Sequence, residues 1–125
     1  MRILLDTHIF YWLFYDQQKL PSAARAILDD ADAVFVSAVS LWEIAIKARV
    51  GKLKADIPEL LRNLEAANLH ELPVLARHTP LVSILPLHHA DPFDRLLIAQ
   101  AMTEPMHLLT ADPQLKQYTD LVIQV

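Results

Sequence analysis

The amino-acid sequence predicts an α/β fold with three layers, in which helices cover both faces of a parallel sheet of about five strands. Two observations support this prediction. Short apolar segments that contain β-branched residues alternate along the chain with segments of helical periodicity. The short segments are apolar on both faces, which is typical of parallel strands that lie between two layers of helices.

The first half of the chain contains two predicted strands and four predicted helices. The strands are short apolar runs at residues 2–5 and 33–36. The helices are predicted where apolar residues recur every three or four positions, at residues 8–15, 22–31, 41–49 and 58–67. Each strand is thus followed by helical segments, as parallel pairing requires.

The second half contains three further predicted strands, and six of the eight prolines lie there. The strands are at about 69–74, at 107–110 and at 121–125. A weak helical pattern covers residues 75–85, a clear one covers 92–103, and a short turn is predicted after Pro113. The prolines separate elements of a single predicted domain, residues 1–125, because the sequence shows no linker, repeat or low-complexity segment.

Composition excludes several classes of function. The 125 residues are 54% apolar and 21% charged, which is typical of a chain that buries one core. The absence of cysteine excludes disulfides, thiolate zinc sites, iron–sulfur clusters and a cysteine nucleophile. The single glycine, Gly51, excludes the glycine-rich loops that bind nucleotide phosphates. No membrane-spanning run and no export signal are visible, so we expect a cytoplasmic protein that does not bind membranes.

The basic residues form one cluster, although the net charge is −4. Lys47, Arg49, Lys52 and Lys54 fall within a short segment that contains no acidic residue. Lysine and arginine neutralise phosphates, so this cluster is the predicted nucleic-acid contact. The alternative is a solvated helix end, since cations are favourable near a helix C-terminus.

Two aspartates follow predicted strands. Asp6 comes directly after residues 2–5, and Asp112 follows residues 107–110. Each also precedes a helical segment, so the alternative for each is an N-cap that accepts a backbone hydrogen bond. This alternative is strong for Asp112, because Pro113 follows it and proline is favoured in the first turn of a helix.

Glu43 lies on a predicted helix in the segment 38–46, where every other residue except Ser40 is apolar. Burying a carboxylate is costly unless it is paired or coordinates a metal. This setting favours a functional role for Glu43. The alternatives are a capping box with Ser40 and an ion pair with Lys47.

Asp94 lies near the start of the predicted helix at 92–103, on the same face as the apolar stripe of that helix. Asp91 already supplies the cap. The spacing therefore predicts that Asp94 points into a crevice rather than into solvent. The alternatives are a favourable position near the helix dipole and an ion pair with Arg95.

In parallel α/β sheets, ligands bind in the crevice beyond the carboxyl ends of the strands. We expect the four acids to converge there, where a cation would offset their mutual repulsion. Carboxylate oxygens select Mg²⁺ or Mn²⁺ before Zn²⁺, and two such ions are a common means of cutting a phosphodiester. Three nearby hydroxyl groups are expected to add ligands or to hold the carboxylates: Thr7, Ser40 and Thr110.

The histidines and aromatic residues point less clearly to a function. His88 and His89 are adjacent in a loop and are expected to point in different directions, so together with Asp91 they do not predict a zinc site. His8 is interpreted as part of a capping turn, with contact to substrate or solvent as the alternative. The aromatic run at 10–15 is interpreted as core or dimer interface, with stacking of bases as the alternative.

Five motifs follow one another along the chain: LDTH at 5–8, SAVSLWEIAIK at 37–47, GKL at 51–53, HADPFDRLLIAQA at 89–101 and LTAD at 109–112. In this order they resemble the PIN-domain proteins, specifically the VapC-like toxin branch. The resemblance implies a parallel five-stranded sheet with an acidic pocket, Mg²⁺ or Mn²⁺ as cofactor, and an endoribonuclease that leaves 5′-phosphate ends. RNA as the substrate is implied by the resemblance alone.

The resemblance also assigns roles to residues and partners. The four acids of the family, which bind metal and catalyse cleavage, match Asp6, Glu43, Asp94 and Asp112. Thr110 matches the hydroxyl residue that precedes the fourth acid, and Asp91 is assigned to capping and support. The basic cluster becomes the candidate RNA contact. The chain is then expected to be the toxin of a toxin–antitoxin pair, to form homodimers, and to bind a small antitoxin that covers the acidic pocket.

Three other interpretations are open from the sequence. A degenerate PIN module would bind RNA or protein without cutting, although all four acids are present. A haloacid-dehalogenase-like phosphotransferase needs a second aspartate two residues after the first, where this chain has His8. A receiver-like phospho-acceptor pairs two acids after the first strand with a late lysine, a pattern that Asp6 and Lys116 match poorly.

Overall fold

The structure is a computed structural model that describes residues 1–125, and it contains one sheet of five strands. The strands are β1 (Arg2–Leu5), β2 (Ala33–Ser37), β3 (Leu69–Leu72), β4 (His107–Thr110) and β5 (Val122–Gln124). Their order in the sheet is β3-β2-β1-β4-β5. Every neighbouring pair is parallel.

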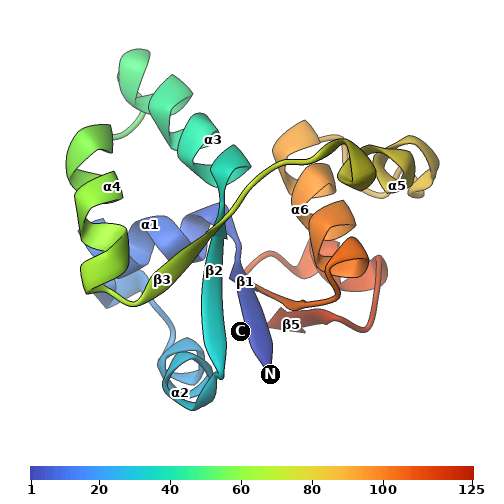
Figure 1. Ribbon diagram of the computed structural model, residues 1–125, viewed down its shortest axis with the longest axis horizontal. Coiled ribbons are helices and arrows are strands. Elements are labelled where there is room, and N and C mark those ends of the chain that lie inside the picture. Colours follow the sequence, from blue (N-terminus) through green and yellow to red (C-terminus); the bar gives the residue numbers. More distant parts are fainter.

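Six α-helices connect the strands: α1 (Thr7–Tyr15), α2 (Ser22–Asp30), α3 (Ala38–Arg49), α4 (Ile57–Ala66), α5 (Thr79–Ile84) and α6 (Pro92–Thr103). Short 3₁₀ helices lie at η1 (Gln17–Lys19), η2 (Ala76–His78) and η3 (Pro113–Gln117). Helices α1, α2 and α4 lie on one side of the sheet, and α5 and α6 lie on the other (Figure 1). The predicted three-layer α/β fold is therefore confirmed. No helix has the length and apolar character needed to cross a membrane.

Two predicted boundaries and one predicted helix differ from the structure by more than one residue. Helix α3 begins at Ala38 rather than at residue 41, because Ser37 is its N-cap and accepts a hydrogen bond from Val39 N at 3.1 Å. The strand predicted at 69–74 ends at Leu72, since Pro73 follows and has no N–H to donate. The weak helical pattern at 75–85 divides into η2 and α5.

The hydrophobic core lies on both faces of the central strand. Ile3, Leu4 and Leu5 of β1 are fully buried. Ile3 and Leu5 belong to the cluster beneath α1, α2 and α4, whereas Leu4 packs into the cluster beneath α6. Alternate side chains of a strand point to opposite faces, which explains why this strand is apolar at consecutive positions. The same packing fixes the position of the next residue, Asp6.

The topology places a crevice at the carboxyl end of β1. Strands β2 and β3 lie on one side of β1, and β4 and β5 lie on the other, so the strand order reverses here. In open α/β sheets, ligands bind beyond the carboxyl ends of the strands at such a point. Helices α1 and α3 and the loop after β4 all begin at this edge.

Candidate metal centre

Asp6 directly follows β1 and is 2% exposed. It occupies the N-cap position of α1, but its side chain makes no capping hydrogen bond, so the capping alternative is wrong for its carboxylate. Oδ2 instead accepts a hydrogen bond from Thr110 Oγ1 at 2.6 Å, and Oδ1 is buried without a partner. Burial raises the pKa of Asp6, because a low-dielectric environment disfavours the charged form, and this outweighs the lowering effect of the Thr110 hydrogen bond.

Glu43 lies in the second turn of α3 and is 3% exposed. The capping box with Ser40 is wrong, because Ser37 is the N-cap and Ser40 lies inside the helix. The alternative ion pair is present, since Lys47 Nζ lies 2.7 Å from Glu43 Oε2. The other oxygen, Oε1, is buried without a hydrogen-bond partner. Lys47 thus provides a hydrogen bond to only one of the two oxygens of this carboxylate.

Asp94 lies in the first turn of α6, and its partner is His89 rather than Arg95. His89 Nε2 lies 2.8 Å from Asp94 Oδ2. The guanidinium of Arg95 donates instead to backbone carbonyl groups at the end of α5, so the predicted alternative of an Asp94–Arg95 ion pair is wrong. Burial and the negative charge of Asp6 raise the pKa of Asp94 to about 7, despite the hydrogen bond from His89.

The raised pKa values of Asp94 and His89 predict that the metal-free protein loses stability as the pH rises from 5 to 8. The pKa of Asp94 is raised from 3.8 to about 7, so in this range the folded chain binds more protons than the unfolded chain and the free energy of unfolding falls. For His89, burial lowers the pKa, but the hydrogen bond and charge of Asp94 raise it overall, which acts in the same sense. We expect a fall on the order of 2 kcal/mol, allowing for solvent screening, measured by urea unfolding in EDTA. A rise would contradict the prediction.

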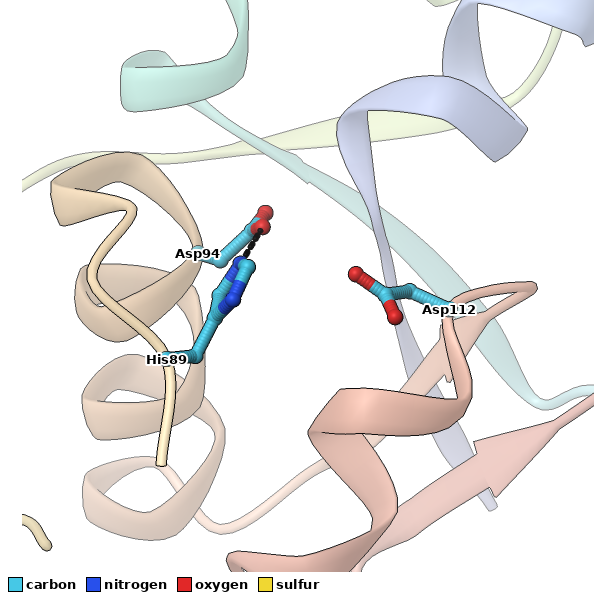
Figure 2. A group of neighbouring side chains, drawn as sticks. All are labelled: His89, Asp94 and Asp112. Carbon is cyan, nitrogen blue, oxygen red and sulfur yellow. Dashed lines mark hydrogen bonds and ion pairs between the residues drawn. The ribbon is translucent and has the colours of Figure 1, made fainter. Parts of the chain in front are cut away.

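Asp91 and Asp112 both cap helices. Asp91 Oδ1 accepts hydrogen bonds from the backbone N of Phe93 and Asp94, at 2.8 and 3.1 Å, as its assigned capping role predicts. Asp112 Oδ1 accepts one from the first turn of η3 at 2.9 Å. Even so, one carboxylate oxygen of Asp112 lies within 4.8 Å of ligand atoms of His89 and Asp94. Figure 2 shows the side chains of His89, Asp94 and Asp112 facing one space from two separate segments of the chain.

The four acids lie near one another at the carboxyl end of β1. Asp6 and Asp112 line a cavity of about 270 Å³ at the carboxyl end of β1. A carboxylate oxygen of Asp94 lies within 4.8 Å of one of Asp112. The negative charge of Glu43 is the smallest of the named causes that raise the pKa values of Asp6 and Asp94, which shows that Glu43 is near both. The structure therefore brings the predicted acids together at the predicted edge of the sheet, and their catalytic role stays a prediction.

The predicted supporting hydroxyl groups hold the pocket in two ways. Thr110 Oγ1 donates to Asp6 and also accepts from the backbone N of Asp112 at 3.0 Å, which links the first acid to the fourth. Thr7 Oγ1 donates to Ser40 Oγ at 2.8 Å in a buried contact. Because Thr7 and Ser40 bond to each other rather than to a carboxylate, they join the first turns of α1 and α3.

The residues of the pocket fit a divalent cation. Asp6 Oδ1 and Glu43 Oε1 are buried carboxylate oxygens that receive no hydrogen bond. Such oxygens are costly unless they are paired or coordinate a metal. The remaining donors are carboxylate oxygens and one imidazole nitrogen, a set suited to Mg²⁺, Mn²⁺ or a related ion.

The basic cluster is divided in the structure. Lys47 is paired with Glu43 at the pocket, whereas Arg49, Lys52 and Lys54 are exposed and form no salt bridge. Lys47 and Arg49 lie in the last turn of α3, as the helix-end alternative predicts. Contact of the cluster with RNA stays a prediction.

The aromatic run and His8 have different surroundings. Phe10 is fully buried in the core, as the sequence interpretation predicts. His8 is exposed and lines the cavity with Trp12, beside Asp6 and Asp112. Both side chains are therefore placed to contact a ligand of the pocket.

His89 is the pocket residue that the sequence interpretation missed. The sequence treats the two adjacent histidines alike, but His88 packs against the ring of Tyr118 while His89 contacts Asp94. The sequence places His89 two residues before the N-cap Asp91, in the loop that leads into α6. Nothing in that position distinguishes His89 from His88, so only the structure shows which of the two contacts Asp94.

Comparisons with known proteins agree with the fold. A family model described as "PIN domain" matches residues 3–121. "Ribonuclease VapC22" from Mycobacterium tuberculosis is 32% identical to this chain, and the alignment covers 93% of this chain and 91% of that protein.

Three solved structures share the fold. VapBC2 from Rickettsia felis, bound to a promoter DNA fragment, superposes with a TM-score of 0.68 at 18% identity and covers 100% of this chain and 98% of its own. A toxin–antitoxin complex from Klebsiella pneumoniae has a TM-score of 0.70 at 16% identity, and FitAcB from Neisseria gonorrhoeae has 0.67 at 18%. Each of these two covers 98% of this chain and 96% of its own.

Proposed function

Since this chain belongs to the PIN domain family, we propose that it is a divalent-metal-dependent endoribonuclease and the toxin of a toxin–antitoxin pair. Support for RNA as the substrate comes from the Mycobacterium tuberculosis relative, which is named a ribonuclease. The observation that carries the metal dependence is the pair of buried, unpartnered carboxylate oxygens, Asp6 Oδ1 and Glu43 Oε1.

Four residues would hold the metal, Mg²⁺ or Mn²⁺: Asp6, Glu43, Asp94 and Asp112. When bound, the metal supplies a Lewis acid that activates water and offsets the charge that develops on the phosphodiester. The chain itself orients the ligands. Thr110 holds Oδ2 of Asp6, so Oδ1 is left for the cation. Lys47 offsets part of the charge of Glu43 and keeps that side chain in place at the edge of the pocket.

The antitoxin proposal rests on the solved structures with the same fold, which include a protein described as a toxin–antitoxin complex. A small antitoxin that covers the acidic pocket would stop RNA from reaching the carboxylates. By the resemblance of the motifs to VapC-like toxins, we also propose that the chain forms a homodimer.

Cleavage of end-labelled RNA by the purified chain tests the proposed function. We expect cutting with Mg²⁺ or Mn²⁺, products with 5′-phosphate ends, and no cutting in EDTA until excess metal is restored. Cutting that persists in EDTA would contradict the metal dependence. Binding of a divalent ion without cutting of any RNA supplied, including total cellular RNA, would favour the noncatalytic module.

The exposed basic residues are expected to contact RNA rather than metal. Replacing Arg49, Lys52 and Lys54 together by alanine should weaken RNA binding and lower the salt dependence of binding by about 2 units of slope, since each phosphate contact on a single strand contributes about 0.7. Affinity for Mn²⁺ should not change. Fluorescence anisotropy at several salt concentrations measures the slope.

A matched triple variant provides the control for this experiment. Lys19, Arg25 and Arg62 are exposed cations elsewhere on the chain, and their replacement removes the same charge. If both triple variants lower the slope equally, the effect is one of net charge and the cluster is not a specific contact.

A further inference from the structure

The outer part of the pocket contains a nitrogen donor that the four predicted acids do not supply. His89 Nε2 lies 2.8 Å from Asp94 Oδ2, and the ligand atoms of His89, Asp94 and Asp112 all lie within 4.8 Å of one another. The three side chains are partly buried, and they come from the loop before α6, from α6 itself and from the loop after β4. In Figure 2 the carboxylate of Asp112 lies across a short gap from the other two side chains.

An independent observation points to a ligand at the same place. Asp6 is 2% exposed and its Oδ1 has no hydrogen-bond partner, and Asp6 lines the cavity together with Asp112. The outer group of side chains therefore adjoins a buried carboxylate that lacks a positive partner.

The spacing of the outer group is close to that of the ligands around one cation. Ligand atoms at about 2.1 Å from a small divalent ion lie at most about 4 Å apart. A small inward movement of these three side chains is therefore enough to bring their atoms onto one ion. Asp91 and His88 do not compete for this role, since Asp91 caps α6 and His88 packs against Tyr118. His8 also lines the cavity and is the alternative nitrogen donor that the experiment must separate.

We propose that His89, Asp94 and Asp112 form an outer cation site whose imidazole nitrogen makes it bind Mn²⁺ in preference to Mg²⁺. Mg²⁺ favours oxygen ligands in a strict octahedral arrangement, whereas imidazole is a ligand of first-row transition metals. Among these, Mn²⁺ also accepts carboxylates readily. The inner carboxylates, Asp6 and Glu43, offer only oxygen. This inference rests on the proposed metal-dependent function and adds a ligand to it.

Pulsed electron paramagnetic resonance of the full chain, saturated with Mn²⁺ in the absence of RNA, tests the proposal without any measurement of cleavage. A nitrogen bound directly to Mn²⁺ modulates the spin echo. The variants are His89→Gln, which puts an amide oxygen in place of the nitrogen, and the matched control His88→Gln. His8→Gln tests the other histidine that lines the cavity as a competing nitrogen donor. Circular dichroism and urea unfolding check that each variant is folded, and His89→Asn is a second variant in case the first is not.

We expect nitrogen modulation in the wild type, in His88→Gln and in His8→Gln, and its loss in His89→Gln. Loss of the modulation in His8→Gln instead would assign the nitrogen to His8 and overturn the inference. Calorimetric titration should show Mn²⁺ affinity reduced about 10-fold or more in that variant, with a smaller change for Mg²⁺. A loss of about 10-fold or more is already expected when a metal ligand loses its hydrogen-bond partner, and loss of a direct ligand should cost at least as much. Mn²⁺ binding to the wild type without nitrogen modulation, or modulation that persists in folded His89→Gln, would overturn this inference alone. A wild type that binds neither Mn²⁺ nor Mg²⁺ would overturn the proposed function as well.

Discussion

Asp94→Asn is expected to lower RNA cleavage by about 10³-fold or more while the chain keeps its fold. A metal ion supplies several kcal/mol of charge stabilisation in phosphodiester cleavage, and each 1.36 kcal/mol changes the rate tenfold. Asp94 is placed to contribute to both parts of the pocket, because it contacts His89 and its pKa responds to the charge of Asp6. The amide keeps the shape of the side chain but is a neutral and weaker ligand.

The same substitution should stabilise the metal-free protein above pH 7. Burial raises the pKa of Asp94 to about 7, so its negative charge opposes folding at higher pH, and asparagine carries no charge. Most of the fall in stability between pH 5 and 8 should therefore be absent from the variant. Loss of cleavage together with increased metal-free stability distinguishes a missing ligand from a damaged fold.

Cleavage of end-labelled RNA and urea unfolding in EDTA are the two measurements for Asp94→Asn. Asp120→Asn is the control, because Asp120 is exposed and forms no salt bridge. It should retain wild-type cleavage and the wild-type dependence of stability on pH. Full cleavage by Asp94→Asn would show that the assignment of this residue is wrong.

Arg95→Met is expected to have the largest effect on stability, a loss of about 2–4 kcal/mol. Arg95 is 9% exposed, and its guanidinium donates to the carbonyl groups of Val82, Leu85 and Pro86 at 2.8 to 3.1 Å. Methionine has a similar length but no donor. A hydrogen bond from a charged group contributes about 1.5–3 kcal/mol. Once the guanidinium is removed, water can hydrogen-bond only to those of the three carbonyl groups that are partly exposed, so the loss is not fully recovered.

Urea unfolding of the wild type and the variant measures this loss. Arg25→Met is the matched control, since Arg25 is exposed and its guanidinium donates to a single carbonyl group, that of Gln17, at 3.1 Å. The control should lie within about 0.5 kcal/mol of the wild type, as is usual for surface substitutions. Equal losses in the two variants would mean that Arg95 does not stabilise the end of α5.

The fold was predictable from local patterns because its strands and helices are short and separate. Segments apolar on both faces, such as 2–5 and 107–110, pack in the structure between two layers of helices. The errors lie at element ends. Ser37 and Ser40 are both good N-caps by residue type, and only the length of β2 decides which of them starts the helix.

The positions of the four acids were also predictable, because parallel strands bring the residues after their carboxyl ends to one edge. Their hydrogen-bond partners were not. Thr110 is far from Asp6 in sequence, and β4 must pair with β1 before the two side chains meet. His89 contacts Asp94 only because the loop before α6 turns back over the first turn of that helix.

The sequence by itself determined the succession of strands and helices along the chain, the edge of the sheet at which the acids gather, and the exclusion of cysteine chemistry and glycine-rich phosphate loops. Tertiary structure decided which partner each polar side chain takes. It paired Asp94 with His89, turned Arg95 towards carbonyl groups, and left Asp6 Oδ1 buried without a donor. The physical reason is that periodicity fixes the direction of a side chain relative to its own element, whereas hydrogen bonding and desolvation depend on what the other elements pack against it.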